Sequence, residues 1–309
     1  MKIVLITGVA GFIGRYVARY FSKQGWKAIG TDNSPPENAP LADLSAYQRL
    51  QLPDSEFSNL LQTHKPDALI HCAGRSSVAL SVSDPAADFH SNTILTFNLL
   101  DALRLNSPEC KFIFLSSAAV YGNPSKLPID ERHPVSPISP YGFHKLQSEQ
   151  LCLEFSKIYD IPTSSLRIFS AYAPGLRRQV LWDICRKALI QEQELVVLQG
   201  TGQESRDFIH ALDIAKALRV VITSAPMKGE VYNLASGRES TILELATLAL
   251  ESLEHQGKIA FDGIVPVGNP LNWKADISKL QTLGFQPSVP LERGVQTFAS
   301  WCREELVGV

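Results

Sequence analysis

The sequence has no excess of one charge and no run of lysine or arginine. Its 29 basic and 31 acidic residues leave a formal net charge of -2. Nucleic acids and anionic membranes are bound through clustered positive charge, so we expect neither as a partner. Long apolar runs are also missing, and the run in MKIVLITG is too short for a signal peptide. We therefore expect a cytoplasmic protein without a membrane segment.

Cysteine is sparse and shows no pairing motif. The five cysteines are Cys72, Cys110, Cys152, Cys185 and Cys302, and no two of them form a C-x-x-C pair. This spacing favours buried free thiols in a reducing compartment over a disulfide framework or a zinc site, so we expect no bound metal. With 309 residues, of which 45% are hydrophobic, the chain can bury a large core as one domain or two closely joined ones.

Apolar strand patterns alternate with helical patterns through the first 172 residues. KIVLITG, KAIGTD, DALIHCAG and KFIFLSS suit strands that are buried in a parallel sheet. FIGRYVARYFSKQG, DFHSNTILTFNLLDALRLN and YGFHKLQSEQLCLEFSKIYD have the spacing and length of helices. The alternation predicts an α/β fold with a Rossmann-type, doubly wound parallel sheet over residues 1–172.

The composition of the chain changes after Tyr172. Loops rich in glycine and proline, such as LQGTGQESRD and FDGIVPVGNPLNW, separate the helical segments VLWDICRKALIQ and STILELATLALESL. We interpret residues 173–309 as mainly a smaller, interleaved α/β substrate-binding region. A segment near residues 207–236 is expected to return to the first domain.

The segment TGVAGFIG places Gly8, Gly11 and Gly14 between the first strand and the first helix. Glycine permits a tight turn and a close approach to a pyrophosphate, whose charge the helix N-terminus favours. Asp32 ends the second strand about 20 residues later, where it would hold a ribose hydroxyl and repel the 2′-phosphate of NADP. The motif therefore predicts bound NAD. We assign the same cofactor site further residues: Phe12, Ile13, Asn33, Ala73, Gly74 and Ser116.

Tyr141 and Lys145 lie four residues apart at the start of a predicted helix, and therefore on one face. A phenol with a pKa of about 10 is a poor base at neutral pH, but a nearby ammonium stabilises the phenolate. Such a pair can remove a proton from an alcohol while hydride leaves for nicotinamide. The pair predicts a dehydrogenase-like redox site.

With these motifs in place, the chain resembles the extended short-chain dehydrogenase/reductase family. Within it, the pattern is most similar to nucleotide-sugar epimerases and dehydratases of the UDP-glucose 4-epimerase type. The resemblance covers nearly the whole chain and rests on TGVAGFIG, HCAGRSS, SNTILTFNLLDA, SSAAVYG, ISPYGFHK, SRDFIHALDIA, VYNLASG and ADISKLQTLGF, in this order.

The resemblance implies a role for several residues. Tyr141 would be the general base, and Lys145 would hold the nicotinamide ribose and lower the pKa of the tyrosine. Ser117 would hydrogen-bond the reacting sugar oxygen. Asn92 matches a buried asparagine near the active site, for which a structural role is the alternative. Arg206 would bind the substrate diphosphate, with an ion pair to Asp207 as the alternative.

The segment FLSSAAVYG narrows the reaction. The 4,6-dehydratases that the chain resembles carry an Asp-Glu pair directly after the hydroxyl residue, and UDP-glucuronate decarboxylases keep its glutamate, whereas this chain has Ala118 and Ala119. Without these carboxylates, acid catalysis of dehydration is excluded at these positions. We expect a 4-epimerase that retains NAD. A nucleotide-4-keto-sugar reductase and a non-catalytic NAD-binding sensor remain alternatives.

The chain departs from the family pattern on the substrate side. Ser170 stands where an asparagine is common and Pro266 where an arginine is common. Arg177 and Arg178 are candidate replacements for diphosphate binding, because arginine suits phosphate geometry, although both could be solvated loop charges. Trp273 lies near the expected sugar pocket, where it would favour a hexose or hexuronic acid over an N-acetyl sugar.

Two further expectations concern histidines and assembly. His71, His144 and His210 are interpreted as structural residues. The helices DFHSNTILTFNLLDALRL and GFHKLQSEQLCLEFSKIY carry more apolar surface than one sheet face requires. In the family the matching helices form an intersubunit four-helix bundle, so we expect a homodimer.

Overall fold

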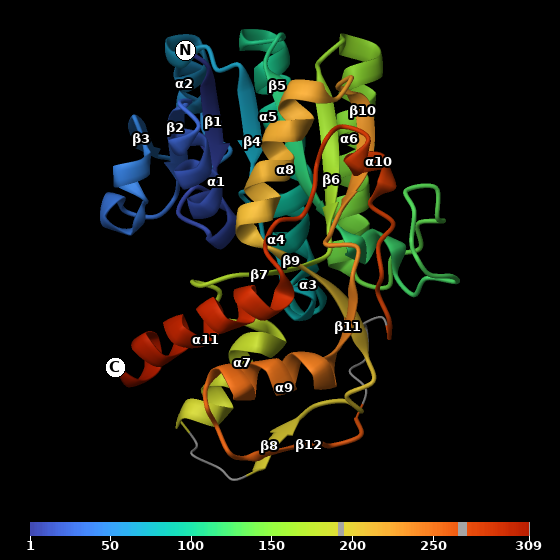
Figure 1. Ribbon diagram of the computed structural model, residues 1–309. Helices are drawn as coiled ribbons and strands as arrows, with labels where there is room; N and C mark the ends of the chain where they lie inside the picture. The colour runs from blue at the N-terminus through green and yellow to red at the C-terminus, as the bar shows by residue number, and fades with distance from the viewer. Residues whose placement is uncertain (191–194, 265–270, 309) are drawn as a thin grey trace.

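The centre of the fold is a sheet of seven parallel strands. The computed structural model describes residues 1–190, 195–264 and 271–308. The strands lie in the order β10-β6-β5-β4-β1-β2-β3 (Figure 1). Their bounds are β1 Ile3–Thr7, β2 Lys27–Asp32, β3 Ala46–Arg49, β4 Ala68–His71, β5 Lys111–Ser117, β6 Thr163–Ile168 and β10 Lys228–Leu234. The predicted Rossmann-type sheet is confirmed, and its strand order reverses between β1 and β4, where such sheets bind ligands.

Helices cover both faces of this sheet. Successive strand residues point to opposite faces, so Val4 packs toward α1 (Phe12–Lys23) and α8 (Ala211–Ser224). Leu5 packs instead toward α2 (Glu56–His64), α5 (Leu95–Asn106) and α6 (Pro140–Tyr159). The continuous apolar character of the strands follows from this burial on both sides.

The structure divides one helix that the sequence predicts as continuous. Instead of a single helix over residues 88–106, a π-helical turn at His90–Ile94 separates α4 (Pro85–Phe89) from α5, and α3 (Val78–Ser83) precedes them. Asn92 lies in this turn, where its Nδ2 donates to the Asp88 carbonyl oxygen at 3.2 Å. Turns of this kind often occur at functional sites.

The remaining chain forms a lobe at the carboxyl ends of the strands. Figure 1 shows α7, α9 and α11 stacked there above the pair β8 and β12. The elements are β7 Ser170–Tyr172, α7 Gln179–Ile190, β8 Leu195–Leu198, β9 Ser205–His210, β11 Glu239–Thr241, α9 Ile242–Ser252, β12 Lys258–Phe261, α10 Ser278–Gln281 and α11 Leu291–Val307. A second sheet has the order β11-β9-β7. Between β9 and β11, the chain returns through α8 and β10, which pairs with β6 in the main sheet.

Two further observations concern the cysteines and the helices. All five cysteines are free; Cys72 is partly buried and the other four are buried. None of the helices formed by the described residues combines the length and hydropathy that a bilayer crossing requires.

Candidate active site

A cavity of ≈ 810 Å³ lies between the carboxyl ends of the strands and the C-terminal lobe. It collects most of the predicted site residues. Those that line it are Gly8, Gly11, Phe12, Ile13, Gly14, Ala73, Gly74, Ser116, Ser117, Tyr141, Lys145, Ser170, Arg178, Arg206 and Trp273. Four predicted residues do not line it: Asp32, Asn33, Asn92 and Arg177.

The glycine-rich loop fits the cofactor that the sequence predicts. Gly8 has a φ of +66°, and a side chain there would come within 2.5 Å of the Ala73 amide nitrogen. A side chain at Gly14 would collide with the Gly8 carbonyl oxygen. The N-cap residue Gly11 offers no side chain to the first amides of α1, which stay available to an anion. These residues leave a cradle of backbone amides that fits a pyrophosphate such as that of NAD.

Asp32 lies beside this loop at the end of β2. Its Oδ2 accepts a hydrogen bond from Ala10 N at 3.0 Å, and its Oδ1 accepts one from Ser34 N at 2.9 Å. Asn33 is directed elsewhere, because its Nδ2 donates to the Gln51 side chain at 3.2 Å. Arg49, for which the sequence gives no signal, is brought to this place by β3, and its Nε donates to the Asn33 carbonyl oxygen at 2.9 Å.

The catalytic candidates are fixed by the strand β5 and the helix α6. Ser117 is the last residue of β5, and its Oγ accepts from Ala119 N at 3.2 Å. Ser139 caps α6 by accepting from Gly142 N at 3.2 Å, which sets the first helical turn around Tyr141. One turn later Lys145 is 6% exposed, and its Nζ donates to the Leu115 carbonyl oxygen at 2.9 Å.

Burial shifts the pKa values of both Tyr141 and Lys145. Burial lowers the pKa of Lys145 to about 8. Burial raises the pKa of Tyr141, whereas the hydroxyl of Ser117 and then the charge of Arg178 lower it. The expectation that Lys145 lowers the pKa of the tyrosine stays a prediction. The lysine lies over the faces of the Tyr141 and Phe114 rings, and the charge of Arg178 also opposes the effect of burial on the phenol.

The two alanines have different surroundings. Ala118 is fully buried in a small apolar cluster, whereas Ala119 lines the cavity. The carboxylates in the cavity wall come from the C-terminal lobe, and both are engaged. Asp183 pairs with Lys187 at 2.7 Å, and Glu204 accepts from Gly202 N at 2.9 Å. Neither occupies the place of the dehydratase acid pair.

Two arginines face the cavity from the lobe. Arg178 bridges to the loop after β4, with its Nη1 2.6 Å from the Ser76 carbonyl oxygen and its Nη2 2.9 Å from Ser76 Oγ. Arg206 donates to the carbonyl oxygens of Ser205 and Leu271 and lies over the Trp273 ring, 5.6 Å from its centroid. It forms no ion pair with Asp207, whose carboxylate accepts from the Ser236, Gly237 and Ala275 amides.

The adjacent Arg177 has a different position. Its guanidinium pairs with Glu305 of α11 at 2.7 Å and lies over the Trp301 ring, outside the cavity. The solvated-charge alternative therefore fits Arg177, and the cavity alternative fits Arg178. Pro266, at which we noted a missing arginine, lies outside the described residues.

The three histidines have structural partners. His71 is buried, its Nδ1 lies 2.8 Å from Thr7 Oγ1, and burial lowers its pKa to about 3. The Nδ1 of His210 accepts from Leu212 N at 3.2 Å and caps α8, as predicted. His144 contacts the buried carboxylate of Asp88, a pairing that the sequence did not indicate.

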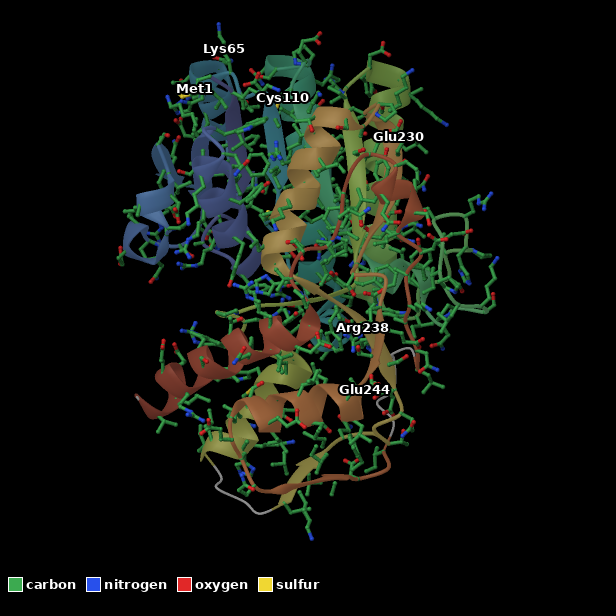
Figure 2. All side chains as sticks on the ribbon, in the orientation of Figure 1. Met1, Lys65, Cys110, Glu230, Arg238 and Glu244 are labelled. Atoms are coloured by element: carbon green, nitrogen blue, oxygen red, sulfur yellow. The ribbon has the colours of Figure 1, made fainter. Side chains whose placement is uncertain are left out.

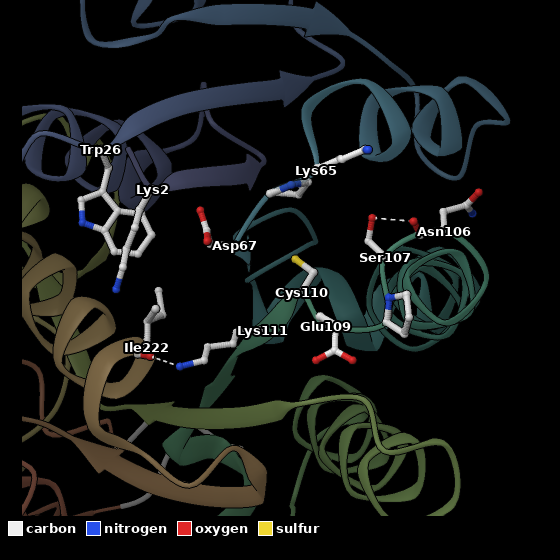
Figure 3. Close-up of a pocket in the computed structure, with 12 residues that line it drawn as sticks. Lys2, Trp26, Lys65, Asp67, Asn106, Ser107, Glu109, Cys110, Lys111 and Ile222 are labelled. Carbon is white, nitrogen blue, oxygen red and sulfur yellow. Dashed lines mark hydrogen bonds between the residues drawn. The ribbon is translucent and has the colours of Figure 1, made fainter.

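A second cavity, of ≈ 490 Å³, opens at the amino ends of the strands (Figure 3). Figure 2 shows Lys65 and Cys110 at this end of the molecule, far from Arg238 in the lobe. Lys111 donates to the Ile222 carbonyl oxygen at 2.7 Å, and Asp67 accepts from the Ile3 amide at 2.6 Å. Its lining has lysines but no tyrosine or glycine-rich loop among the described residues, so the redox site belongs to the other cavity.

The fold and the cavity that holds Ser117, Tyr141 and Lys145 define a class of protein: a nicotinamide-dependent enzyme of the extended short-chain dehydrogenase/reductase type. The model of the NAD dependent epimerase/dehydratase family matches residues 4–235. The chain therefore belongs to that family, which confirms the resemblance found in the sequence and its use of NAD.

The comparisons with individual proteins extend over the whole chain. A UDP-glucose 4-epimerase from Halalkalibacterium halodurans is 29% identical, covering 97% of this chain and 96% of the relative. The crystal structure of a Thermotoga maritima UDP-glucose 4-epimerase with UDP-glucose has a TM-score of 0.89 at 27% identity, covering 99% and 100%. A Bacillus cereus UDP-glucuronic acid 4-epimerase with UDP-glucuronic acid and NAD has a TM-score of 0.88 at 27% identity, covering 98% and 100%.

Proposed function

We propose that this protein is an NAD-dependent nucleotide-sugar 4-epimerase for UDP-glucose and UDP-galactose or for a UDP-hexuronate. One observation carries the proposal: Ser117, Tyr141 and Lys145 meet at one cavity with the glycine-rich loop, while alanine occupies both positions of the dehydratase acid pair. This set of residues is sufficient for oxidation at C4 and for return of the hydride, and it lacks the acid for dehydration.

Different residues of the chain would bind the cofactor and transfer the proton. Gly8, Gly11 and Gly14 would hold the cofactor pyrophosphate, and Asp32 would hold a ribose hydroxyl. A bound NAD would supply the hydride acceptor for C4 and the donor for the return of hydride to the opposite face of the sugar. Tyr141 takes the proton of the C4 hydroxyl during oxidation and returns it during reduction, so the overall reaction consumes no proton and no electrons.

The other polar residues would orient the sugar and its diphosphate. The Ser117 hydroxyl would donate a hydrogen bond to the C4 oxygen, and Lys145 would bind the ribose next to the nicotinamide. Arg206 and Arg178 would bind the diphosphate. Arg206 suits this role because its guanidinium lines the cavity and because no carboxylate among the described residues pairs with it.

Two measurements test the function. Purified protein is expected to keep a nicotinamide chromophore after dialysis, and borohydride should reduce that chromophore. Incubation with UDP-, GDP-, dTDP- and CDP-sugars, followed by separation of C4 epimers, should give turnover of a UDP-hexose or a UDP-hexuronate. Protein that holds no cofactor and requires added NADPH would instead indicate the keto-sugar reductase.

We also propose a cytoplasmic homodimer with a four-helix bundle. The exposed faces of α5 and α6 carry large apolar side chains that support this assembly: Phe97, Leu105, Phe143, Ile158 and Tyr159. Light scattering is expected to give twice the chain mass at micromolar concentration. Ile158→Glu, at a residue that is 67% exposed, should yield a monomer, whereas a monomeric parent protein would contradict the proposal.

A further inference from the structure

Lys145 is a buried cation without a directly bonded carboxylate. It is 6% exposed, and its Nζ donates to the Leu115 carbonyl oxygen. No carboxylate oxygen of the described aspartates and glutamates lies within 4.0 Å of this Nζ. A buried ammonium is costly unless an anion nearby offsets its desolvation. The group that supplies this negative charge therefore determines the pH up to which the lysine stays protonated.

Several ionisable neighbours of Lys145 are neutral near pH 7. Burial lowers the pKa of His71 to about 3 and raises the pKa of Cys72 to about 12. Burial also raises the pKa of Cys152. None of these three side chains supplies a negative charge to the lysine.

Glu149 lies one turn beyond Lys145 but is already neutralised. Its carboxylate accepts from Arg167 Nε at 2.9 Å and from Arg167 Nη2 at 2.7 Å, and Ser116 Oγ donates to it at 2.5 Å. The remaining anion is Asp88, and among the neighbouring charges that raise the pKa of Lys145 its effect is the largest.

Asp88 is held by the residue that precedes the catalytic lysine. The aspartate is on α4 and fully buried, and its Oδ2 lies 2.6 Å from Nδ1 of His144 on α6. Its Oδ1 has no hydrogen-bond partner among the described residues. A buried carboxylate with a single bonded partner is costly unless positive charge lies near it. Asp88 and Lys145 interact through their charges, since Asp88 raises the pKa of Lys145.

We propose that Asp88, held by His144, is a positioning residue that acts through Lys145 and Tyr141 and sets the pH range in which they work. The proposal rests on the proposed function only for the roles of Tyr141 and Lys145. It adds a buried pair formed by Asp88 of α4 and His144 of α6, neither of which lines the active-site cavity.

The sign of the effect follows from the charges. The anion of Asp88 favours the ammonium of Lys145 and disfavours the phenolate of Tyr141. Three other groups face Tyr141: Ser117 and Arg178, which both lower its pKa, and the ammonium of Lys145, which lies over its ring. The acidic limb reports the phenol while Lys145 is still charged, so the direct loss of the Asp88 charge sets its direction. Loss of the Asp88 charge therefore lowers both pKa values, so the acidic and alkaline limbs of a pH–rate profile move in the same direction.

The first test is the pH dependence of kcat/KM for the holoenzyme. Asp88→Asn is expected to move both limbs to lower pH by about one unit, which a purely structural defect would not do. The matched control is Asp101→Asn, because Asp101 lies on α5 in an exposed pair with Arg104 and should leave the profile in place. A profile that loses height but keeps its position would overturn the proposal.

The second test does not require turnover. The phenolate absorbance of Tyr141, obtained as the difference between each protein and its Tyr141→Phe counterpart, is titrated with pH. Asp88→Asn should move this titration to lower pH relative to the wild type. An unchanged or upward titration refutes the proposal even if the epimerase assignment is correct, and a shifted one supports it even if no sugar is turned over.

His144 gives a third, graded comparison. His144→Asn keeps a donor near the position of the imidazole Nδ1, whereas His144→Leu removes it. The leucine variant should move the titration in the same direction as Asp88→Asn, and the asparagine variant should restore most of the wild-type position. Equal behaviour of the two variants would show that the hydrogen bond to Asp88 has no such role.

Discussion

The two walls of the active-site cavity are built in different ways. The sheet half presents Ser117, Tyr141 and Lys145 from a strand end and a capped helix, with the lysine almost fully buried. The lobe presents Arg178 from an exposed loop and Arg206 from β9. Burial changes the pKa values of Tyr141 and Lys145. The difference supports our proposal that the sheet half provides the chemistry and the lobe provides substrate binding.

The largest expected effect tests the sheet half. Tyr141→Phe removes the proton acceptor and should lower kcat by about a thousandfold, the usual scale for a general base. Cofactor binding should persist, because the glycine-rich loop is untouched, and the absorbance of bound nicotinamide checks this. A variant that keeps an appreciable fraction of the parental rate would remove Tyr141 from the role of base.

The next effect tests the lobe. Arg206→Ala removes a half-buried guanidinium that we assign to the diphosphate, so KM should rise roughly tenfold with little change in kcat. Arg206→Lys keeps the charge but not the forked geometry, and an intermediate KM is expected. Steady-state kinetics separate the two parameters. A fall in kcat alone would break the division between the two walls.

Arg178 gives the strictest test of this division between the two walls. It belongs to the lobe, but its charge lowers the pKa of Tyr141. Arg178→Ala should raise the pKa of the phenol, since a cation that favours the phenolate is lost. The acidic limb of the pH–rate profile should then move to higher pH, opposite to the shift expected for Asp88→Asn. An unmoved limb would confine Arg178 to substrate binding.

The smallest expected effect concerns Arg177. Its pair with Glu305 is solvent-exposed, so Arg177→Ala should change the free energy of unfolding by less than about 0.5 kcal/mol. Kinetic constants should be unchanged, because the side chain does not reach the cavity. Urea unfolding and kinetics measured side by side with Arg178→Ala check this. A raised KM would bring Arg177 back to the diphosphate.

The sequence predicted the main sheet and the lobe helices α7 and α9 well but not the strands of the lobe, for a physical reason. The segments KAIGTD and KFIFLSS coincide with β2 and β5, because strands buried on both faces must be continuously apolar. In the lobe, β8 alternates between exposed and buried residues, and β11 has only three residues. Such short, half-buried strands have little pattern of their own and form through contacts with distant segments.

The site shows the same division at the level of single residues. The sequence by itself determined the glycine cradle, the position of Ser117 and the Tyr141–Lys145 pair, because each depends on local geometry within one turn or one helix face. Only the tertiary structure decided that Arg178, not Arg177, faces the cavity, and that Asp88 meets His144 across 56 residues. Which buried charges meet depends on how α4 packs on α6, and a linear sequence does not contain that packing.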